Sequence, residues 1–223
     1  MSRLTWDNVG ERYYETGVKN GVLYVYDAKT KKYSAGVAWN GLTAVTESPS
    51  GAEATALYAD DIKYLNLMSN EEFGGTIEAY TYPDAFKECN GEVSLGGMTI
   101  GAQTRKTFAF CYRTTLGNDE AGSDYGYKLH VVYGALASVS EKAYATINDS
   151  PEAITFSWEF TTTPVKVTID GVEYKPTACV TIDSTKVAPE AMASLEDALY
   201  GAESEDAQLL MPEEIHEIIK AAG

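Results

Sequence analysis

The chain has 223 residues, of which 44% are hydrophobic, 22% charged and 11% aromatic, as in ordinary soluble globular proteins. Its formal net charge of −16 argues against a protein that grips DNA or an anionic membrane through a basic face. No stretch approaches the roughly 18 apolar residues of a membrane span, and residues 1–7 lack the apolar core of a signal peptide, so we expect a protein made and used in a cytoplasm, with no membrane partner.

From residue 21 to about residue 164, the chain consists of short runs rich in Val, Thr, Tyr, Phe and Ile that alternate in polarity. Gly, Asn, Asp and Pro separate these runs, which is typical of an antiparallel β protein. We therefore expect a two-layer β-sandwich or part of a barrel, with turns at residues 117–119 and 148–151. The expected strands are residues 22–26, 35–46, 53–58, 62–67, 75–82, 107–116, 127–137, 143–147 and 154–163.

Two short helices are predicted inside the β region, near residues 69–73 and at residues 83–89. In the second, Pro83-Asp84 resembles a helix start and Asn90-Gly91 a helix stop. After Pro164, residues 165–169 and 177–182 flank Asp170-Gly171, a dipeptide that favours a tight hairpin turn.

Residues 187–223 lose the alternation and predict two helices that begin at Pro189 and Pro212, each with acidic residues in its first turn. Residues 201–208 between them are acidic and predict a loop. This tail holds nine acidic residues and one lysine, a net of −8, which is half of the whole charge. We expect residues 1–186 to form the β-sandwich domain and residues 187–223 an acidic helical extension.

The titratable and nucleophilic residues form no recognisable catalytic or metal-binding motif. Cys89, Cys111 and Cys179 are widely spaced, with no Cys-x-x-Cys, and predict reduced, mostly buried thiols. His130 and His216 lack the spacing of metal ligands, so structural roles are favoured.

Three further segments fail the tests for known sites. Residues 48–51 lack the nucleophile elbow of a serine hydrolase, and the glycines at 96, 97 and 101 lack the spacing of a phosphate loop. Residues 118–126 loosely resemble a calcium loop but lack its ligand spacing and closing Glu, so a solvated hairpin loop is favoured. We expect no enzyme, no cofactor and no metal.

The strand around residues 154–161 has large apolar side chains at even positions and small polar or acidic ones at odd positions. This alternation predicts one packed face and one wet face that carries no Lys or Arg.

A second feature is the predicted pair of strands 35–46 and 53–58, whose side chains are mostly Ala and Thr. Long exposed strands of this kind favour a partner that covers them, although a self-contained sandwich with ordinary core hairpins is the alternative. The predicted tip between the two strands consists of Glu47, Ser48, Pro49, Ser50 and Gly51.

Six segments in the same order closely resemble the major tail protein, or tail tube protein, of long non-contractile-tailed phages and prophages of Gram-positive bacteria. The resemblance covers nearly the whole chain. The segments are GVAWNGLTAVTESPSGAE (36–53), LYADDIKYLNLMSNEEFGGTIEAYTYPDAF (57–86), KTFAFCYRTTLGND (106–119), DYGYKLHVVYGALA (124–137), EKAYATINDSPEAITFSWEFTTTPV (141–165) and TIDSTKV (181–187).

The resemblance implies a β-sandwich subunit that assembles into hexameric rings, which stack into the tube that conducts the DNA genome without binding it specifically. It implies a location in the virion tail, assembly in the host bacterial cytoplasm, and tape measure, tail terminator and distal tail proteins as partners. Some relatives carry an extra immunoglobulin-like domain, whereas this chain has the acidic helical tail. On this interpretation the odd positions Thr155, Ser157, Glu159 and Thr161 face the lumen, and Glu47 to Gly51 contact a neighbouring subunit or ring.

Two other functions stay open from the sequence. The first is a monomeric β-sandwich module that binds a ligand or carbohydrate through tyrosines at its surface. The chain has 16 tyrosines, a residue type that suits such half-exposed positions. The second is the related tube of a contractile or injection machine.

Overall fold

The computed structural model describes residues 3–147, 149 and 152–223. It confirms the predicted fold class, because 49% of the chain is strand and 12% helix, and the strands pair antiparallel. The strands are β1 Tyr13–Asp27, β2 Lys32–Tyr33, β3 Val37–Trp39, β4 Leu42–Glu47, β5 Ser50–Gly51, β6 Ala54–Ala59, β7 Ile62–Met68, β8 Glu71–Glu72, β9 Gly74–Ala79, β10 Val93–Leu95, β11 Met98–Ile100, β12 Phe108–Asn118, β13 Gly122–Ala137, β14 Phe156–Thr162, β15 Val165–Ile169, β16 Val172–Thr177 and β17 Cys179–Asp183. The helices are α1 Phe86–Cys89, α2 Pro189–Tyr200 and α3 Pro212–Ala221.

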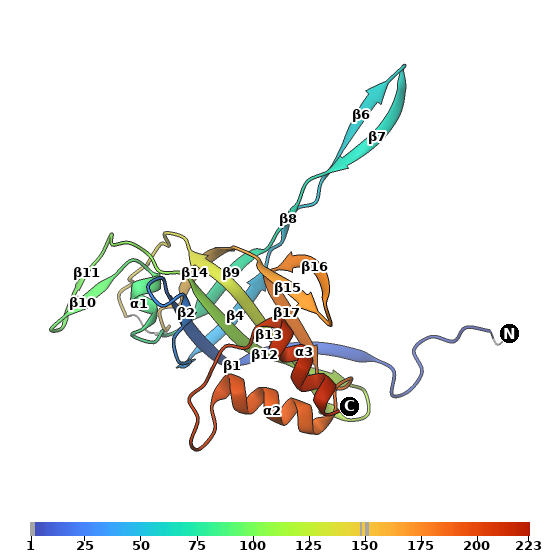
Figure 1. The fold of residues 1–223 in the computed structure, drawn as a ribbon. Helices are drawn as coiled ribbons and strands as arrows, with labels where there is room; N and C mark the ends of the chain where they lie inside the picture. Colours follow the sequence, from blue (N-terminus) through green and yellow to red (C-terminus); the bar gives the residue numbers. More distant parts are fainter. Residues whose placement is uncertain (1–2, 148, 150–151) are drawn as a thin grey trace.

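The main sheet runs in the order β2-β1-β12-β13-β14-β9-β4 and folds over on itself to make a sandwich (Figure 1). We call β1, β12 and β13 the central sheet, to which β3 and β17 are paired, and β14, β9 and β4 the outer sheet. The fold-over lies near Gly134, whose φ of +59° accompanies a register shift between β12 and β13. A side chain at position 134 would collide with the carbonyl oxygen of Thr163, so the bend requires glycine.

The core between the two sheets is built from aromatic side chains. Trp158 of the outer sheet packs in edge contacts with Phe86 of α1 and Trp39 of β3, at ring-centroid distances of 5.1 and 5.7 Å. Phe160 meets Phe110 of the central sheet at 5.3 Å. These rings are almost fully buried, so this layer supplies a large share of the apolar burial that stabilises the fold.

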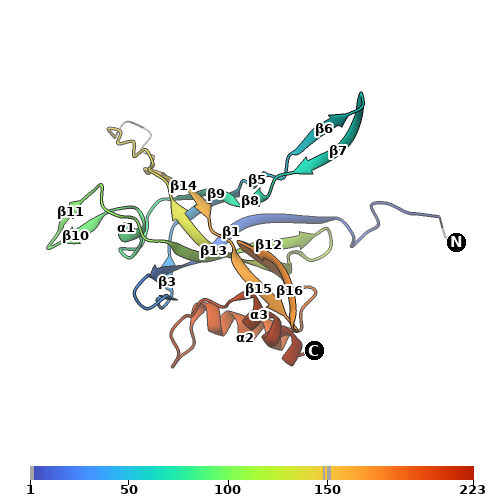
Figure 2. The same cartoon turned by 45° about the horizontal axis from the view of Figure 1, so that its top comes forward.

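Helices α2 and α3 cover the opposite face of the central sheet (Figure 2). Leu195 and Leu199 of α2 and Ile215 of α3 are buried in one cluster with Tyr24 and Tyr133 of the sheet. The predicted helices of the tail and the loop between them are confirmed, and the helices share a core with the sandwich. The domain boundary after residue 186 stays a prediction.

One predicted strand has the wrong extent, and one predicted hairpin pairs the wrong strands. Residues 35–46 form two strands, because Gly41, with a φ of +75°, turns the chain between β3 and β4. The strand predicted at residues 53–58 corresponds to β6, which pairs with β7 and not with β4. Strand β4 pairs with β9 instead. The tip of the projecting hairpin is therefore Asp60-Asp61, where both residues have positive φ, and not Glu47 to Gly51.

Three smaller predictions are also corrected. Residues 69–73 contain the strand β8 and no helix, because β8 pairs with β5 where the two legs of the hairpin leave the body. Residues 143–147, where a strand was predicted, form no strand and are exposed. The partner of β15 is β16, while residues 179–183 join the central sheet as β17.

The remaining predicted elements are confirmed with shifted ends, and a short hairpin of β10 and β11 was not predicted. Helix α1 lies inside the predicted 83–89 segment. The turn predicted at residues 117–119 is present between β12 and β13, but it lies two residues later, at residues 119–121. The turn predicted at residues 148–151 lies outside the described residues, apart from Asp149.

Candidate functional site

The exposed side of the outer sheet carries the residues predicted to face a lumen. Glu159 and Thr161 of β14 are exposed, as is Thr155 just before it, while Ser157 is half-buried. The intervening Trp158 and Phe160 are buried against the central sheet. The predicted alternation of faces is therefore confirmed, while the lumenal role stays a prediction.

The same polar surface continues across the two neighbouring strands. Glu159 lies opposite Thr76 of β9, which lies opposite Thr46 of β4, and Ser157 lies opposite Glu78 of β9. Partners in register point to the same side of a sheet, so these side chains form one surface. We call it the acidic face, and it consists of Thr46, Thr76, Glu78, Ser157, Glu159 and Thr161. None of its six residues is basic.

The hairpin of β6 and β7 stands away from the body and is called the arm here (Figures 1 and 2). Neither face of the arm is buried, because almost all side chains of β6 and β7 are exposed. Its exposed apolar residues are Leu57, Tyr58, Ile62, Tyr64, Leu65, Leu67 and Met68, with exposed fractions from 39% to 73%. A two-stranded hairpin with apolar side chains on the outside is marginally stable alone and prone to pairing, so the arm calls for a partner surface.

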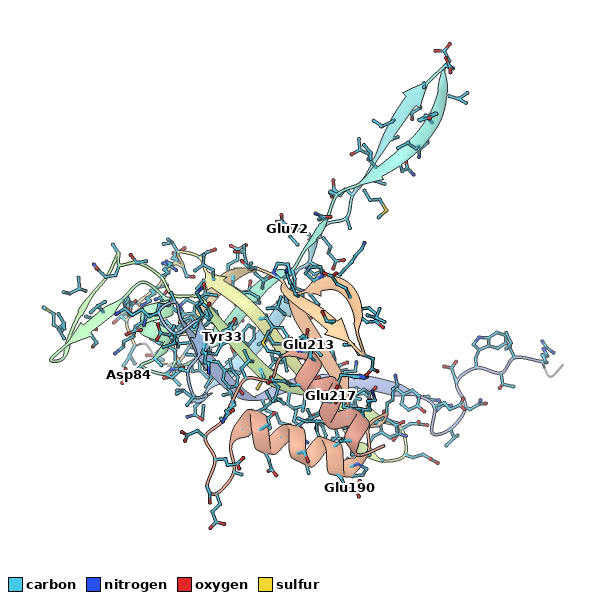
Figure 3. The ribbon with its side chains drawn as sticks, viewed as in Figure 1. Tyr33, Glu72, Asp84, Glu190, Glu213 and Glu217 are labelled. Atoms are coloured by element: carbon cyan, nitrogen blue, oxygen red, sulfur yellow. The ribbon has the colours of Figure 1, made fainter. Side chains whose placement is uncertain are left out.

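The five residues predicted as a hairpin tip lie at the root of the arm instead. Glu47 ends β4, and Ser50 and Gly51 pair with β8, near the labelled Glu72 in Figure 3. Their contact with a neighbouring subunit stays a prediction.

A cluster of polar side chains at this root was missed by the sequence analysis. His130 of β13 stacks on Tyr112 of β12, with ring centroids 4.6 Å apart and an interplanar angle of 2°. Its two ring nitrogens each lie 3.5 Å from a carboxylate, Nε2 from Glu15 and Nδ1 from Glu47. The alternation in β13 places His130 on the sandwich side, but its partners come from distant strands that no local pattern connects.

Hydrogen bonds determine how the histidine is held. The hydroxyl of Thr114 donates to Glu15 at 2.5 Å, and its oxygen lies 3.0 Å from Nε2 of His130. Because a hydroxyl has one hydrogen, Thr114 accepts from His130, so Nε2 carries a proton. The Tyr112 hydroxyl donates to Glu47 at 2.5 Å. The cluster thus ties β1, β12 and β13 to the strand from which the arm leaves.

The two carboxylates of the cluster are stabilised in their charged form. The contact with His130, followed by the hydrogen bond from Tyr112, lowers the pKa of Glu47 despite partial burial. Partial burial alone would raise the pKa of Glu15, but hydrogen bonds from Lys128 and Thr114 outweigh it and lower the pKa. Burial raises the pKa of Tyr112, so this phenol stays protonated and serves as a donor.

The residues considered for other chemistry have structural surroundings. Burial raises the pKa of the thiols of Cys89, Cys111 and Cys179 to about 12, and all three are free. The oxygen of the Asn118 side chain accepts from the backbone of residues 120 and 121, as in a tight hairpin loop. At the surface, Nε2 of His216 lies 3.3 Å from Oδ2 of Asp170.

The described residues contain no group of three or more His, Cys, Asp or Glu residues placed to hold a metal ion. No helix in the described part of the chain is long and apolar enough to cross a membrane.

Comparison with known proteins gives distant structural likenesses. No family model matches the chain, and no curated protein matches its sequence. A chain of the anti-feeding prophage (AFP) baseplate is similar over 80% of this chain and 97% of that one, with a TM-score of 0.36 and 8% identity. A chain of the sheath-tube complex of PVC, an extracellular contractile injection system, is similar over 74% of this chain and 88% of that one, with a TM-score of 0.32 and 13% identity. At these TM-scores neither likeness supports a functional argument.

Proposed function

We propose that the chain is the subunit of a phage tail tube, which polymerises as stacked hexameric rings and conducts the DNA genome from capsid to host. The observation that carries the proposal is the acidic face, a continuous polar surface over three strands with no basic residue. Duplex DNA carries about one negative charge per 1.7 Å of its axis, so it adheres to a basic wall and slides past an acidic one. The resemblance of nearly the whole sequence to tail tube proteins supports the same function.

The arm supports polymerisation. Its apolar side chains are covered by nothing within the subunit's described residues, and a neighbouring subunit or ring would bury them. The root residues Glu47 to Gly51, of which Ser50 and Gly51 pair with β8, would adjoin that contact.

On this proposal the partners are further copies of the chain, together with tape measure, tail terminator and distal tail proteins. The protein would belong to the virion tail and assemble in the host bacterial cytoplasm. It would act without enzymatic activity or cofactor, because a conduit requires only a wall of suitable shape and charge.

Negative-stain electron microscopy of the purified protein at rising concentration tests the proposal. We expect rings or tubes with a central channel, and sedimentation that shifts to large species. A strictly monomeric protein at all salt concentrations, with or without tail assembly factors, would contradict polymerisation. Such a result would favour the alternative of a monomeric carbohydrate-binding module, which a glycan-binding assay would then detect.

A further inference from the structure

A groove with a cavity volume of about 1000 Å³ lies where the β1–β2 turn meets the link between β14 and β15 and the loop that precedes α3. Its lining includes the half-buried apolar side chains of Tyr33, Leu209 and Met211. Lys31 and Lys32 supply exposed positive charge from the β1–β2 turn. Asp206 and Glu214 supply exposed negative charge from the α2–α3 side. The labelled Tyr33 marks the groove in Figure 3.

The N-terminal segment, residues 3–7, has the complementary chemistry. Leu4 and Trp6 are 74% and 73% exposed, and a basic residue, Arg3, and an acidic one, Asp7, flank them. In an extended chain, residues two apart point to the same side, so Leu4 and Trp6 form one apolar edge.

The base of this segment is fixed to the body. The backbone N–H of Gly10 donates to Asp119 at 3.1 Å, and the side chain of Arg12 donates to the carbonyl oxygen of Asp7 at 2.9 Å. The segment therefore leaves the subunit from a defined point beside the β12–β13 turn.

The segment cannot reach the groove of its own subunit. It precedes one end of β1, where Tyr13 pairs with Asn118, whereas the groove lies at the other end, where Asp27 pairs with Lys32. The 15 residues of β1 span roughly 45 Å. Residues 3–7 reach about 18 Å at most. The first described residues lie on the far side of the body from β2 in Figure 1, and from β3 in Figure 2.

We propose that residues 3–7 of one subunit dock into this groove on a second copy of the chain. Leu4 and Trp6 cover the apolar floor, Arg3 faces Asp206 and Glu214, and Asp7 faces Lys31 and Lys32. Because segment and groove lie at opposite ends of the subunit, the contact is head-to-tail, which generates rings or filaments and not closed pairs. The inference rests on the proposed polymerisation and names one contact that it requires.

Two full-length variants test it, each changed at exposed positions so that the core is untouched. Leu4→Ser with Trp6→Ser removes the apolar edge and keeps the groove. Ala35→Trp fills the groove, because Ala35 is an exposed lining residue, and keeps the segment. We expect neither variant to polymerise alone, at concentrations where the wild type forms large assemblies. A 1:1 mixture should associate again into dimers or larger species, because each mixed pair retains one intact segment and one intact groove.

Val139→Ser is the matched control, since it removes an 88% exposed apolar side chain elsewhere and should leave polymerisation unchanged. Sedimentation measures the species, and circular dichroism confirms folding. Polymers of either variant at wild-type concentrations, or a mixture that stays monomeric, would overturn the inference while the wild-type rings still support the proposed function. A wild type that never polymerises would overturn both.

Discussion

The hydroxyl of Tyr112 donates a 2.5 Å hydrogen bond to Oε1 of Glu47, and this contact joins the central sheet to the last residue of β4. Tyr112 is 3% exposed, whereas 38% of the Glu47 side chain is exposed. The bond therefore reaches from the aromatic core to the point where the arm leaves the body. Its loss would affect both the stability of the subunit and the anchoring of the arm.

Tyr112→Phe removes this bond and preserves the ring that stacks on His130. We expect the free energy of unfolding to fall by about 1.5 kcal/mol, the lower end of the range for a hydrogen bond to a charged group, because solvent reaches Glu47. Urea denaturation followed by circular dichroism measures the change. Tyr14→Phe, at a 46% exposed tyrosine, is the control and should change stability by less than about 0.5 kcal/mol. Equal effects of the two substitutions would contradict a structural role for the bond.

The two carboxylates of the cluster predict a loss of stability in acid. Because the pKa values of Glu15 and Glu47 are lowered by folding, their contribution is present above the usual pKa of 4.5 and is lost as the pH falls through the folded values. Glu47→Gln should therefore flatten the dependence of unfolding free energy on pH below about 4.5. Urea titrations between pH 3 and 7 compare the variant with the wild type. Parallel curves for the two proteins would show that Glu47 does not contribute.

The alternation in β14 predicts opposite effects of adjacent substitutions. Trp158→Ala should destabilise the subunit by about 3 to 5 kcal/mol, because it truncates a side chain that is 1% exposed. Glu159→Lys, at the exposed position next to it, should change the unfolding free energy by less than about 0.5 kcal/mol. Thermal and urea denaturation measure both. The reverse ranking would mean that the two faces of β14 are assigned the wrong way round.

The sequence predicts the elements of this fold better than it predicts which elements pair. The alternation around Trp158 was sufficient to assign both faces of β14, because one strand with one buried face carries its own pattern. The hairpin arm was paired wrongly, because the predicted turn at Ser48-Pro49 and the actual turn at Asp60-Asp61 both have turn-forming residues. Pairing depends on long-range contacts that local pattern does not contain, and the His130 cluster was missed for the same reason.

The arm predicts that polymerisation depends on its apolar side chains. Leu57 and Leu65 are cross-strand partners that are 41% and 39% exposed. Replacing both by Ser should leave the body folded, because the arm contributes nothing to either core cluster, and should raise the concentration required for polymerisation. Sedimentation measures that concentration, with Val139→Ser as the control. An unchanged concentration would show that the arm is not part of the subunit contact.

The acidic face predicts a defect in genome passage that is separate from assembly. In a hexameric ring, Glu159→Lys changes the wall by about twelve charge units, because each of the six copies changes by two. Such a wall attracts phosphate groups, and release of counterions makes the attraction fall steeply with salt. We expect Glu159→Lys tubes to assemble normally and to slow or trap the DNA in an infection or ejection assay, with partial rescue at high salt. Glu173→Lys, the same charge change at an exposed position of β16 outside the acidic face, is the control and should eject DNA at the normal rate. Normal ejection through Glu159→Lys tubes would show that β14 does not line the channel.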